Sequence, residues 1–226
     1  RVIDKINKRK HIVEEIIDSE ITYVKNIEVL DHYFYPAFQN SGIFDRFQLK
    51  IIFRDIQPII KTHLDLIREE AKIKPNYNSE VGPLFLNFID RFKVAIPFVT
   101  NFKNVDEMIQ KKRLLSKNND NLFLDICSKN PNQQGGDFIS YYIMPVQRYP
   151  RYTLLIRDLD KCTPPFHPDK QYLTLAQESI IMANREIDET TQRVKQFIIL
   201  GEIQKTLQLE KYIHNMLPFH FRKPQL

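Results

Sequence analysis

The stretch YYIMPVQRYPRYTLLI, residues 141–156, decides how the chain is interpreted, because its apolar and polar signals conflict. Two prolines, Pro145 and Pro150, each cost about 3 kcal/mol in a helix interior. The apolar residues nevertheless predict a helix buried against a core: Ile143, Met144, Leu154, Leu155 and Ile156. Polar side chains that are costly to bury unpaired fall in the same turns: Gln147, Arg148 and Arg151. A core helix that is both broken and polar needs an explanation beyond packing.

Length and composition describe a globular protein and leave its partner open. The 226 residues can form one large domain or two small ones, and 42% hydrophobic with 27% charged residues argues against a disordered chain. No run approaches the ~20 apolar residues of a transmembrane helix. The net charge of +5 permits an acidic protein, an anionic membrane or a nucleic acid as partner. We find no nucleic-acid-binding motif, and we interpret the basic clusters at 8–10 and 111–113 as solvated helix faces.

Apolar residues recur three and four positions apart almost throughout, which predicts long helices. The first should end at Pro36, and the second should run from about residue 48 to 72 with a kink at Pro58. Two more are expected from about 84 to 98 and from about 105 to the loop at 129–137. The last should start near Asp169 and run toward residue 214, with an apolar seam that suits coiled-coil-like packing: Leu173, Ala176, Ile180, Ala183, Ile187, Val194 and Ile198.

These patterns predict an all-α fold, an elongated bundle of long helices over residues 1–214. The tail LPFHFRKPQL (217–226) breaks the helical pattern, so residues 215–226 are expected to be a linker or the start of a further domain. Two isolated cysteines, Cys127 and Cys162, are too few for a disulfide framework and suit a reducing cytosol.

The residues that could carry covalent chemistry are scattered. The six histidines and the two cysteines have no metal-binding spacing, and no glycine-rich phosphate loop is present. We therefore expect no metal, no cofactor and no catalytic residue of the chain's own.

Three sets of polar residues fall where a plain core would not place them. Glu20 lies in the middle of the apolar stripe of the first helix, about 40° from Ile16 on a helical wheel. Its carboxylate either pairs with a basic group on a neighbouring helix or marks a surface where another protein binds. In the proline segment, Arg148 should turn inward toward carbonyls freed by the prolines, which leaves Gln147 and Arg151 facing outward. Asp188, on the flank of the last helix, would by itself be an ordinary solvated residue.

The segments that hold these groups resemble those of Dbl-homology (DH) domains, the guanine nucleotide exchange factors of Rho-family GTPases. Residues 138–169, FISYYIMPVQRYPRYTLLIRDLDKCTPPFHPD, resemble the third conserved region of the family, with Thr153 in place of its usual proline. Residues 12–30 resemble the first, in which Ser19 stands for the usual threonine. The segment REIDETTQRVKQ (185–196) resembles a late region in which Asp188 takes the place of asparagine.

The resemblance implies that the three sets form one exposed surface that binds a Rho-family small GTPase. By carry-over, Glu20 would bind switch I, while Gln147 and Arg151 would engage switch II beside Asp188. Ile143 matches a position that helps to select the GTPase, and isoleucine there leans toward Rac-like partners. Mg²⁺ and GDP would leave the GTPase and GTP would enter, with no covalent bond broken by the exchange factor.

Two alternatives stay open beside this reading. One is an exchange-inactive DH-like scaffold that binds protein partners. It stays open because Asp188 takes the place of the usual asparagine. The other is a basic helical domain that binds anionic membranes or nucleic acid. For an exchange factor we expect a cytoplasmic location, a pleckstrin-homology domain after the bundle, and membrane recruitment only through segments outside this chain.

Overall fold

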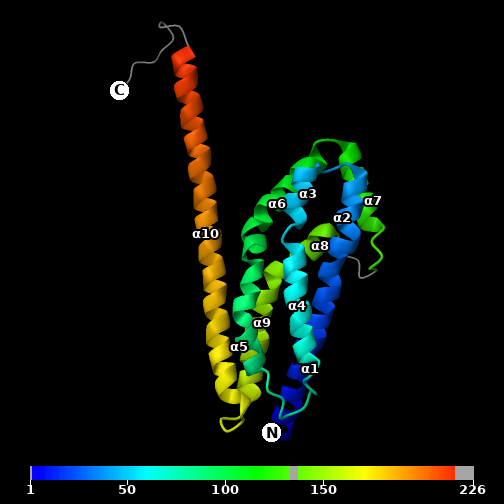
Figure 1. The fold of residues 1–226 in the computed structure, drawn as a ribbon, viewed down its shortest axis with the longest axis vertical. Helices are drawn as coiled ribbons and strands as arrows, with labels where there is room; N and C mark the ends of the chain where they lie inside the picture. The colour runs from blue at the N-terminus through cyan, green and yellow to red at the C-terminus, as the bar shows by residue number, and fades with distance from the viewer. Residues whose placement is uncertain (1, 133–136, 217–226) are drawn as a thin grey trace. The chain divides into compact units, whose positions relative to one another are not determined.

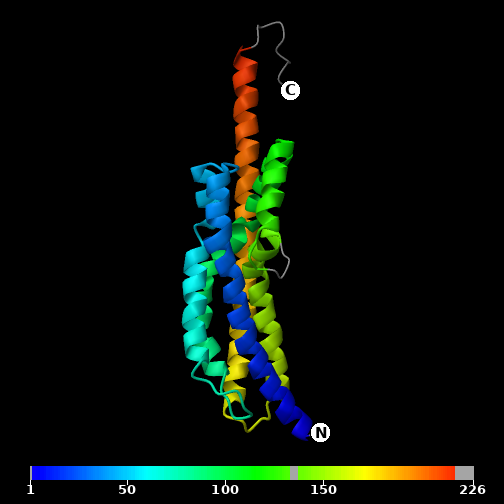
Figure 2. The same cartoon turned by 90° about the vertical axis from the view of Figure 1, so that its right-hand side faces the viewer.

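The computed structural model describes residues 2–132 and 137–216, which contain helices and no strand (Figures 1 and 2). The predicted all-α class is confirmed. The elements are α1 (Val2–Val29), the π-helix η1 (Leu30–Phe34), α2 (Tyr35–Ser41), α3 (Arg46–Phe53), α4 (Ile56–Glu70), α5 (Gly82–Phe92), the 3-10 helix η2 (Lys93–Ala95), α6 (Ile96–Leu114), α7 (Lys117–Ser128), α8 (Phe138–Tyr142), α9 (Met144–Cys162) and α10 (Asp169–Met216). None of the described helices is long and apolar enough to cross a membrane.

The chain divides into two compact units, Arg1–Ile187 and Asp188–Leu226. The first contains α1 to α9 and the first part of α10, and the second contains the continuation of α10 through Met216. The predicted boundary after residue 214 thus falls within the last turn of a helix. Residues 217–226, where a linker or strand was expected, lie outside the described residues.

The first helix does not end at Pro36 as its sequence predicts. The N–H of Tyr35 bonds to the carbonyl of Leu30, which closes a π turn, and Pro36 then lies in the first turn of α2. A proline there loses no hydrogen bond, since first-turn N–H groups have no partner within the helix. The helical run ends only at Gly42, whose φ of 69° lies in the left-handed region that favours glycine.

Two further predicted helices are divided differently from the expectation. The kink near Pro58 is a full break at residues 54–55, between α3 and α4. The helix expected from about residue 105 begins at Ile96 and ends at Leu114, and a new helix starts after Ser116. The Ser116 side chain accepts a hydrogen bond of 3.1 Å from the Asn119 N–H, which caps α7.

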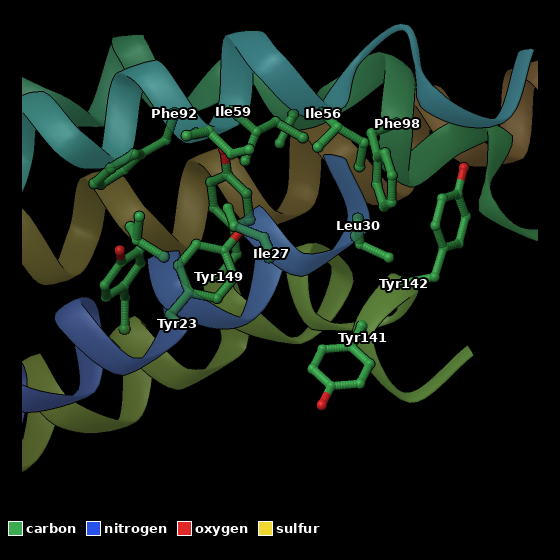
Figure 3. Packing of buried hydrophobic residues seen from close by; sticks show 14 of the residues in the cluster. Tyr23, Ile27, Leu30, Ile56, Ile59, Phe92, Phe98, Tyr141, Tyr142 and Tyr149 are labelled. Carbon is green, nitrogen blue, oxygen red and sulfur yellow. The ribbon is translucent and has the colours of Figure 1, made fainter. Parts of the chain in front are cut away.

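The core of the first unit is continuous and rich in aromatic residues. Helix α1 packs against α4 and α9, and Figure 3 shows Ile27 of α1 and Leu30 of η1 facing Ile56 and Ile59 of α4. The predicted seam of α10 is confirmed where it lies in this unit, because its members are buried: Leu173, Ala176, Ile180, Ala183 and Ile187. A Cβ atom at Gly82 would lie 2.6 Å from the backbone of Tyr172, so the approach of α5 to α10 requires glycine.

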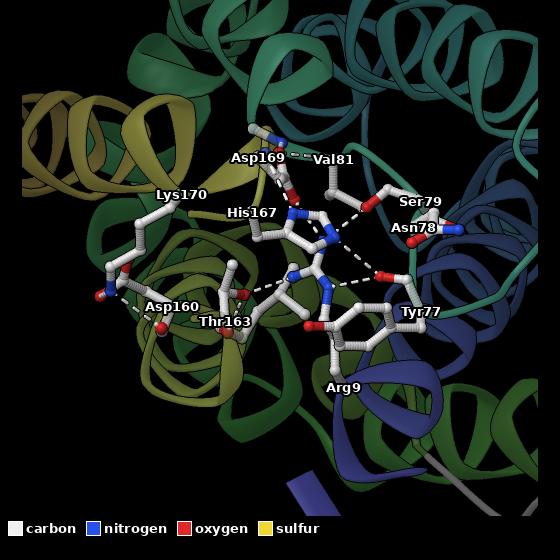
Figure 4. A network of polar contacts seen from close by, with 12 residues as sticks. Arg9, Tyr77, Asn78, Ser79, Val81, Asp160, Thr163, His167, Asp169 and Lys170 are labelled. Carbon is white, nitrogen blue, oxygen red and sulfur yellow. Dashed lines mark hydrogen bonds and ion pairs between the residues drawn. The ribbon is translucent and has the colours of Figure 1, made fainter. Parts of the chain in front are cut away.

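A fully buried ion pair fastens one end of α1 (Figure 4). Arg9 was expected on a solvated face; Lys8 and Lys10 are indeed exposed, but Arg9 is completely buried. Its guanidinium bonds to Asp169 at 2.8 Å and to the backbone carbonyls of Tyr77 and Ser79. The other carboxylate oxygen of Asp169 accepts hydrogen bonds from the N–H groups at the start of α5, and the bond from Gly82 is 2.7 Å long. The pair therefore joins α1, α5 and α10.

The tautomer of His167 follows from its two hydrogen bonds in this cluster. The Asp169 N–H donates to Nδ1 at 3.1 Å, and Nε2 lies 2.9 Å from the carbonyl oxygen of Tyr77. Nδ1 therefore accepts and Nε2 carries the hydrogen, which describes a neutral imidazole.

Replacing Arg9 with methionine should lower the free energy of unfolding by about 3–5 kcal/mol, because Asp169 would stay buried without its cation. Urea unfolding followed by circular dichroism measures the change. The matched control is Lys10→Met, whose side chain is 48% exposed and which should change the value by less than about 0.5 kcal/mol. A loss below about 1 kcal/mol for Arg9→Met would contradict the structural role of the pair.

Candidate protein-binding site

Glu20 is fully buried inside the bundle, so the prediction that it lies on an exposed surface is wrong. One carboxylate oxygen lies 2.6 Å from Nδ1 of His63 on α4. The other accepts hydrogen bonds from Arg148 and from the hydroxyl of Tyr152, both on α9. The alternative interpretation, a carboxylate paired with basic groups of neighbouring helices, is confirmed.

These partners keep Glu20 ionised. Burial by itself would raise the pKa of this carboxyl. The opposing charges of His63 and Arg148, with the hydrogen bonds from His63 and Tyr152, outweigh burial and lower the pKa to about 2. The carboxylate is thus held as the centre of an interaction among three helices and is unavailable to a partner protein.

Arg148 turns inward, as predicted, but for a different reason. It was expected to bond to carbonyls freed by the prolines, and it binds Glu20 instead. Its guanidinium also lies over the rings of Tyr23 and Tyr152, 5.0 and 4.5 Å from their centroids. The inner polar face of α9 therefore belongs to the core.

The outer face of α9 carries the residues that were expected to face solvent. Gln147 and Arg151 are both exposed, which confirms that part of the prediction, and Ile143 is partly exposed. Leu154, one turn beyond Arg151, was predicted to be buried and is 49% exposed. An apolar side chain thus extends the polar face.

A groove of about 640 Å³ runs between this face and α1. Glu15 and Asp18 of α1 lie on one side of it, while Gln147 and Arg151 of α9 lie on the other. Arg151 approaches Glu15 to 3.5 Å, and both side chains are about half exposed. The groove therefore offers a carboxylate and a guanidinium that are accessible and only weakly paired.

Glu15 lines the groove and was not among the residues that the sequence singled out. It lies five positions before Glu20, a rotation of about 140° from the centre of the apolar stripe on a helical wheel. That angle places its carboxylate on the solvent side of α1, which was a usable signal. The sequence alone does not distinguish it, because an acidic residue on a polar helix face is ordinary.

Asp188 is exposed and is the first residue of the second unit. Its predicted place beside Gln147 and Arg151 stays a prediction. Asn184, one turn earlier and in the first unit, donates a hydrogen bond of 2.8 Å to the hydroxyl of Thr153 on α9. Thr153, which stands in place of the family's usual proline, thus has a hydrogen-bond partner on α10.

Comparison with known proteins shows which domain family the sequence matches. The family model of the RhoGEF domain matches residues 12–188. Two proteins of Dictyostelium discoideum are similar: "Guanine exchange factor for Rac 30", 31% identical over 88% of this chain, and "Rac guanine nucleotide exchange factor JJ", 26% identical over 90%. This chain spans 12% of the length of the first and 18% of the second.

A solved structure has the same fold. The PDZ-RhoGEF DH/PH domains, in a complex with GTPγS-activated RhoA, superpose with a TM-score of 0.81 at 20% identity. The superposition covers 89% of this chain and 58% of that one. The helical bundle is therefore shared at low sequence identity.

Glu70, at the end of α4, is a second buried carboxyl near Glu20. It is 1% exposed, and neither carboxyl oxygen has a hydrogen-bond partner among the described residues. Burial, and to a smaller extent the negative charge of Glu20, raise the pKa of Glu70 to about 9. At neutral pH this side chain is a neutral acid.

The pKa of Glu70 predicts a pH-dependent cost to folding. Between its ordinary value of 4.5 and about 9, the folded state holds a proton that the unfolded state releases, so stability should fall as pH rises. Glu70→Gln stays neutral and should remove this cost. The free energy of unfolding of the variant should therefore rise relative to that of the parent by about 1 kcal/mol for each pH unit above pH 5. Urea unfolding from pH 5 to 8 measures it.

Glu69→Gln, at the neighbouring position with its side chain 46% exposed, is the control and should track the parent at every pH. A constant difference between Glu70→Gln and the parent across the range would contradict the raised pKa.

Proposed function

Since the chain belongs to the RhoGEF domain family, we propose that it is a guanine nucleotide exchange factor that binds a Rho-family GTPase in the groove between α1 and α9. The observation that carries the proposal is the exposed pair of Glu15 and Arg151. These opposite charges come from segments far apart in the sequence and lie on one surface.

The pair is well suited to a partner that carries both donors and acceptors. An exposed ion pair contributes about 0–1 kcal/mol, so separating Glu15 from Arg151 costs little. Each group can then form charge-assisted hydrogen bonds with the partner in an interface from which water is excluded. Gln147 adds an amide that can donate and accept.

Exchange follows from preferential binding. A GTPase holds GDP through Mg²⁺ and ordered switch regions. A partner that binds the nucleotide-free arrangement more tightly must weaken GDP binding by the same factor. GDP and Mg²⁺ then leave, GTP enters, and the exchange factor forms and breaks no covalent bond.

We assign to Glu15 the contact with switch I that the sequence had suggested for Glu20, because Glu20 is buried in the core. Arg151 and Gln147 contact switch II in this proposal, and Asp188 is a further residue that we assign to the GTPase contact. Ile143, the residue just before α9, contributes to selection of a Rac-like GTPase in this proposal. We place the reaction in the cytoplasm.

A scaffold that binds the GTPase without releasing GDP is the second candidate. Asp188 favours it, because a carboxylate lacks the hydrogen-bond donors of the asparagine usual at that position. Binding without accelerated loss of GDP would select this candidate.

Glu15→Ala and Arg151→Glu should each slow the release of a fluorescent GDP analogue from a Rac-type GTPase by at least about tenfold. Each removes one charged contact of about 2–5 kcal/mol. Both side chains are about half exposed, so circular dichroism should show the fold unchanged. Stopped-flow fluorescence with a panel of Rac- and Rho-type GTPases measures the rates.

Glu69→Ala on α4 and Arg157→Glu on α9 are the matched controls, since both are exposed and neither lines the groove. They should keep the parent rate. Full activity in both groove variants would overturn the assignment of the site.

A further inference from the structure

The turn between α6 and α7 presents two leucines to solvent. Leu114 is 86% exposed and Leu115 is 72% exposed. Adjacent leucines at this exposure leave most of their apolar surface uncovered by the bundle. Their side chains are available to another apolar phase.

The turn is held in place by its own hydrogen bonds. The Asn119 side chain donates to the carbonyl of Lys112 at 3.1 Å, which satisfies a carbonyl at the end of α6. Arg113 bonds to Asp120 at 2.7 Å and lies over the ring of Phe123. Together with the Ser116 cap, these contacts fix the backbone that displays the leucines.

A third apolar side chain lies at the same end of the first unit. Phe47, in the first turn of α3, is 72% exposed. Its neighbour Gln48 lines one shallow depression together with Leu115, so α3 and the turn after α6 are adjacent. Figures 1 and 2 both place α3 and the α6–α7 turn at the end of this unit opposite the N-terminus.

Lysines surround these apolar residues. Lys111, Lys112 and Lys117 flank the leucines, and no ion pair involves them among the described residues. Arg46 and Lys50 flank Phe47 on α3 and are exposed. Of the nearby acids, Asp120 binds Arg113 and Glu107 lies 3.6 Å from Lys103, while Asp45 accepts the Gln48 N–H at the start of α3. The surface therefore carries an excess of positive charge.

We propose that this end of the bundle, residues 111–117 with Phe47, is a docking site for an anionic lipid bilayer. Leucine and phenylalanine side chains would enter the boundary between headgroups and acyl chains, while the lysines contact anionic headgroups. Lysine stems can lie along apolar surface and keep the ammonium at headgroup level. The charge favours a bilayer over a neutral apolar partner.

The site shares no residue with the groove between α1 and α9. It is therefore independent of the proposed exchange activity and would place the chain itself on the membrane. For an exchange factor, the sequence had suggested membrane contact only through segments outside this chain, while a basic helical domain that binds anionic membranes stayed open as an alternative. Residues 111–113 had been interpreted as an ordinary solvated face.

Co-sedimentation with vesicles of phosphatidylcholine containing about 30% phosphatidylserine tests the proposal, with pure phosphatidylcholine vesicles for comparison. The parent should bind the anionic vesicles and not the neutral ones. Leu114→Ser/Leu115→Ser and Lys111→Glu/Lys112→Glu should each weaken binding about tenfold or more. Parent-like circular dichroism and GDP release would show that these variants are folded.

Controls come from the opposite end of the first unit. Phe166→Ser removes an 88% exposed apolar side chain there, and Lys74→Glu/Lys161→Glu reverses two exposed charges. Both should bind like the parent. Absence of binding to anionic vesicles, or equal losses in the control and tip variants, would overturn the proposal.

Insertion can be measured directly because the chain has no tryptophan. In Leu115→Trp, the single indole should shift its emission to the blue on adding anionic vesicles and should be quenched by brominated lipids. Phe166→Trp should show neither effect. An unchanged spectrum of Leu115→Trp with bound vesicles would show surface attachment without insertion and would also overturn the proposal.

Discussion

The buried carboxylate of Glu20 is the interaction on which the arrangement of this bundle depends. It binds His63 of α4 with one oxygen and Arg148 and Tyr152 of α9 with the other. A buried ion pair is a weak source of net stability, but removing one partner leaves an uncompensated charge and is strongly destabilising. Because the carboxylate accepts from fixed directions, it also restricts how α1, α4 and α9 can pack against each other. Arg9 and Asp169 act in the same way at one end of α1.

This constraint explains why the segment at residues 141–156 is both polar and interrupted by prolines. Its inner polar residue, Arg148, completes the pair with Glu20, and its outer residues, Gln147 and Arg151, form one side of the groove. Pro145 lies in the first turn of α9, where no hydrogen bond is lost, and only Pro150 is inside the helix. The ion pair that sets the spacing of α1 and α9 thus also brings Glu15 and Arg151 to 3.5 Å from each other.

The helices and most of the core could be predicted from the sequence because apolar periodicity reports burial directly. The breaks were harder to place. The sequence predicts that the first helix ends at Pro36, whereas the structure has a π turn at residues 30–34 before it. Such a turn depends on packing that apolar periodicity does not encode. The outward direction of Gln147 and Arg151 followed from helical spacing. The identity of the exposed carboxylate did not follow, because a glutamate within an apolar stripe can be paired inside or free outside, and only its neighbours in space decide. His63 is 43 residues away from Glu20, and Arg148 is 128 residues away.

A double-mutant cycle of Glu20→Gln and Arg148→Met, read as the free energy of unfolding in urea, tests this account most directly. Each single variant should lose several kcal/mol, and the double variant should lose less than their sum by roughly 2 kcal/mol or more. Additive losses with a coupling energy near zero would contradict the claim that this buried pair sets the packing of α1 against α9.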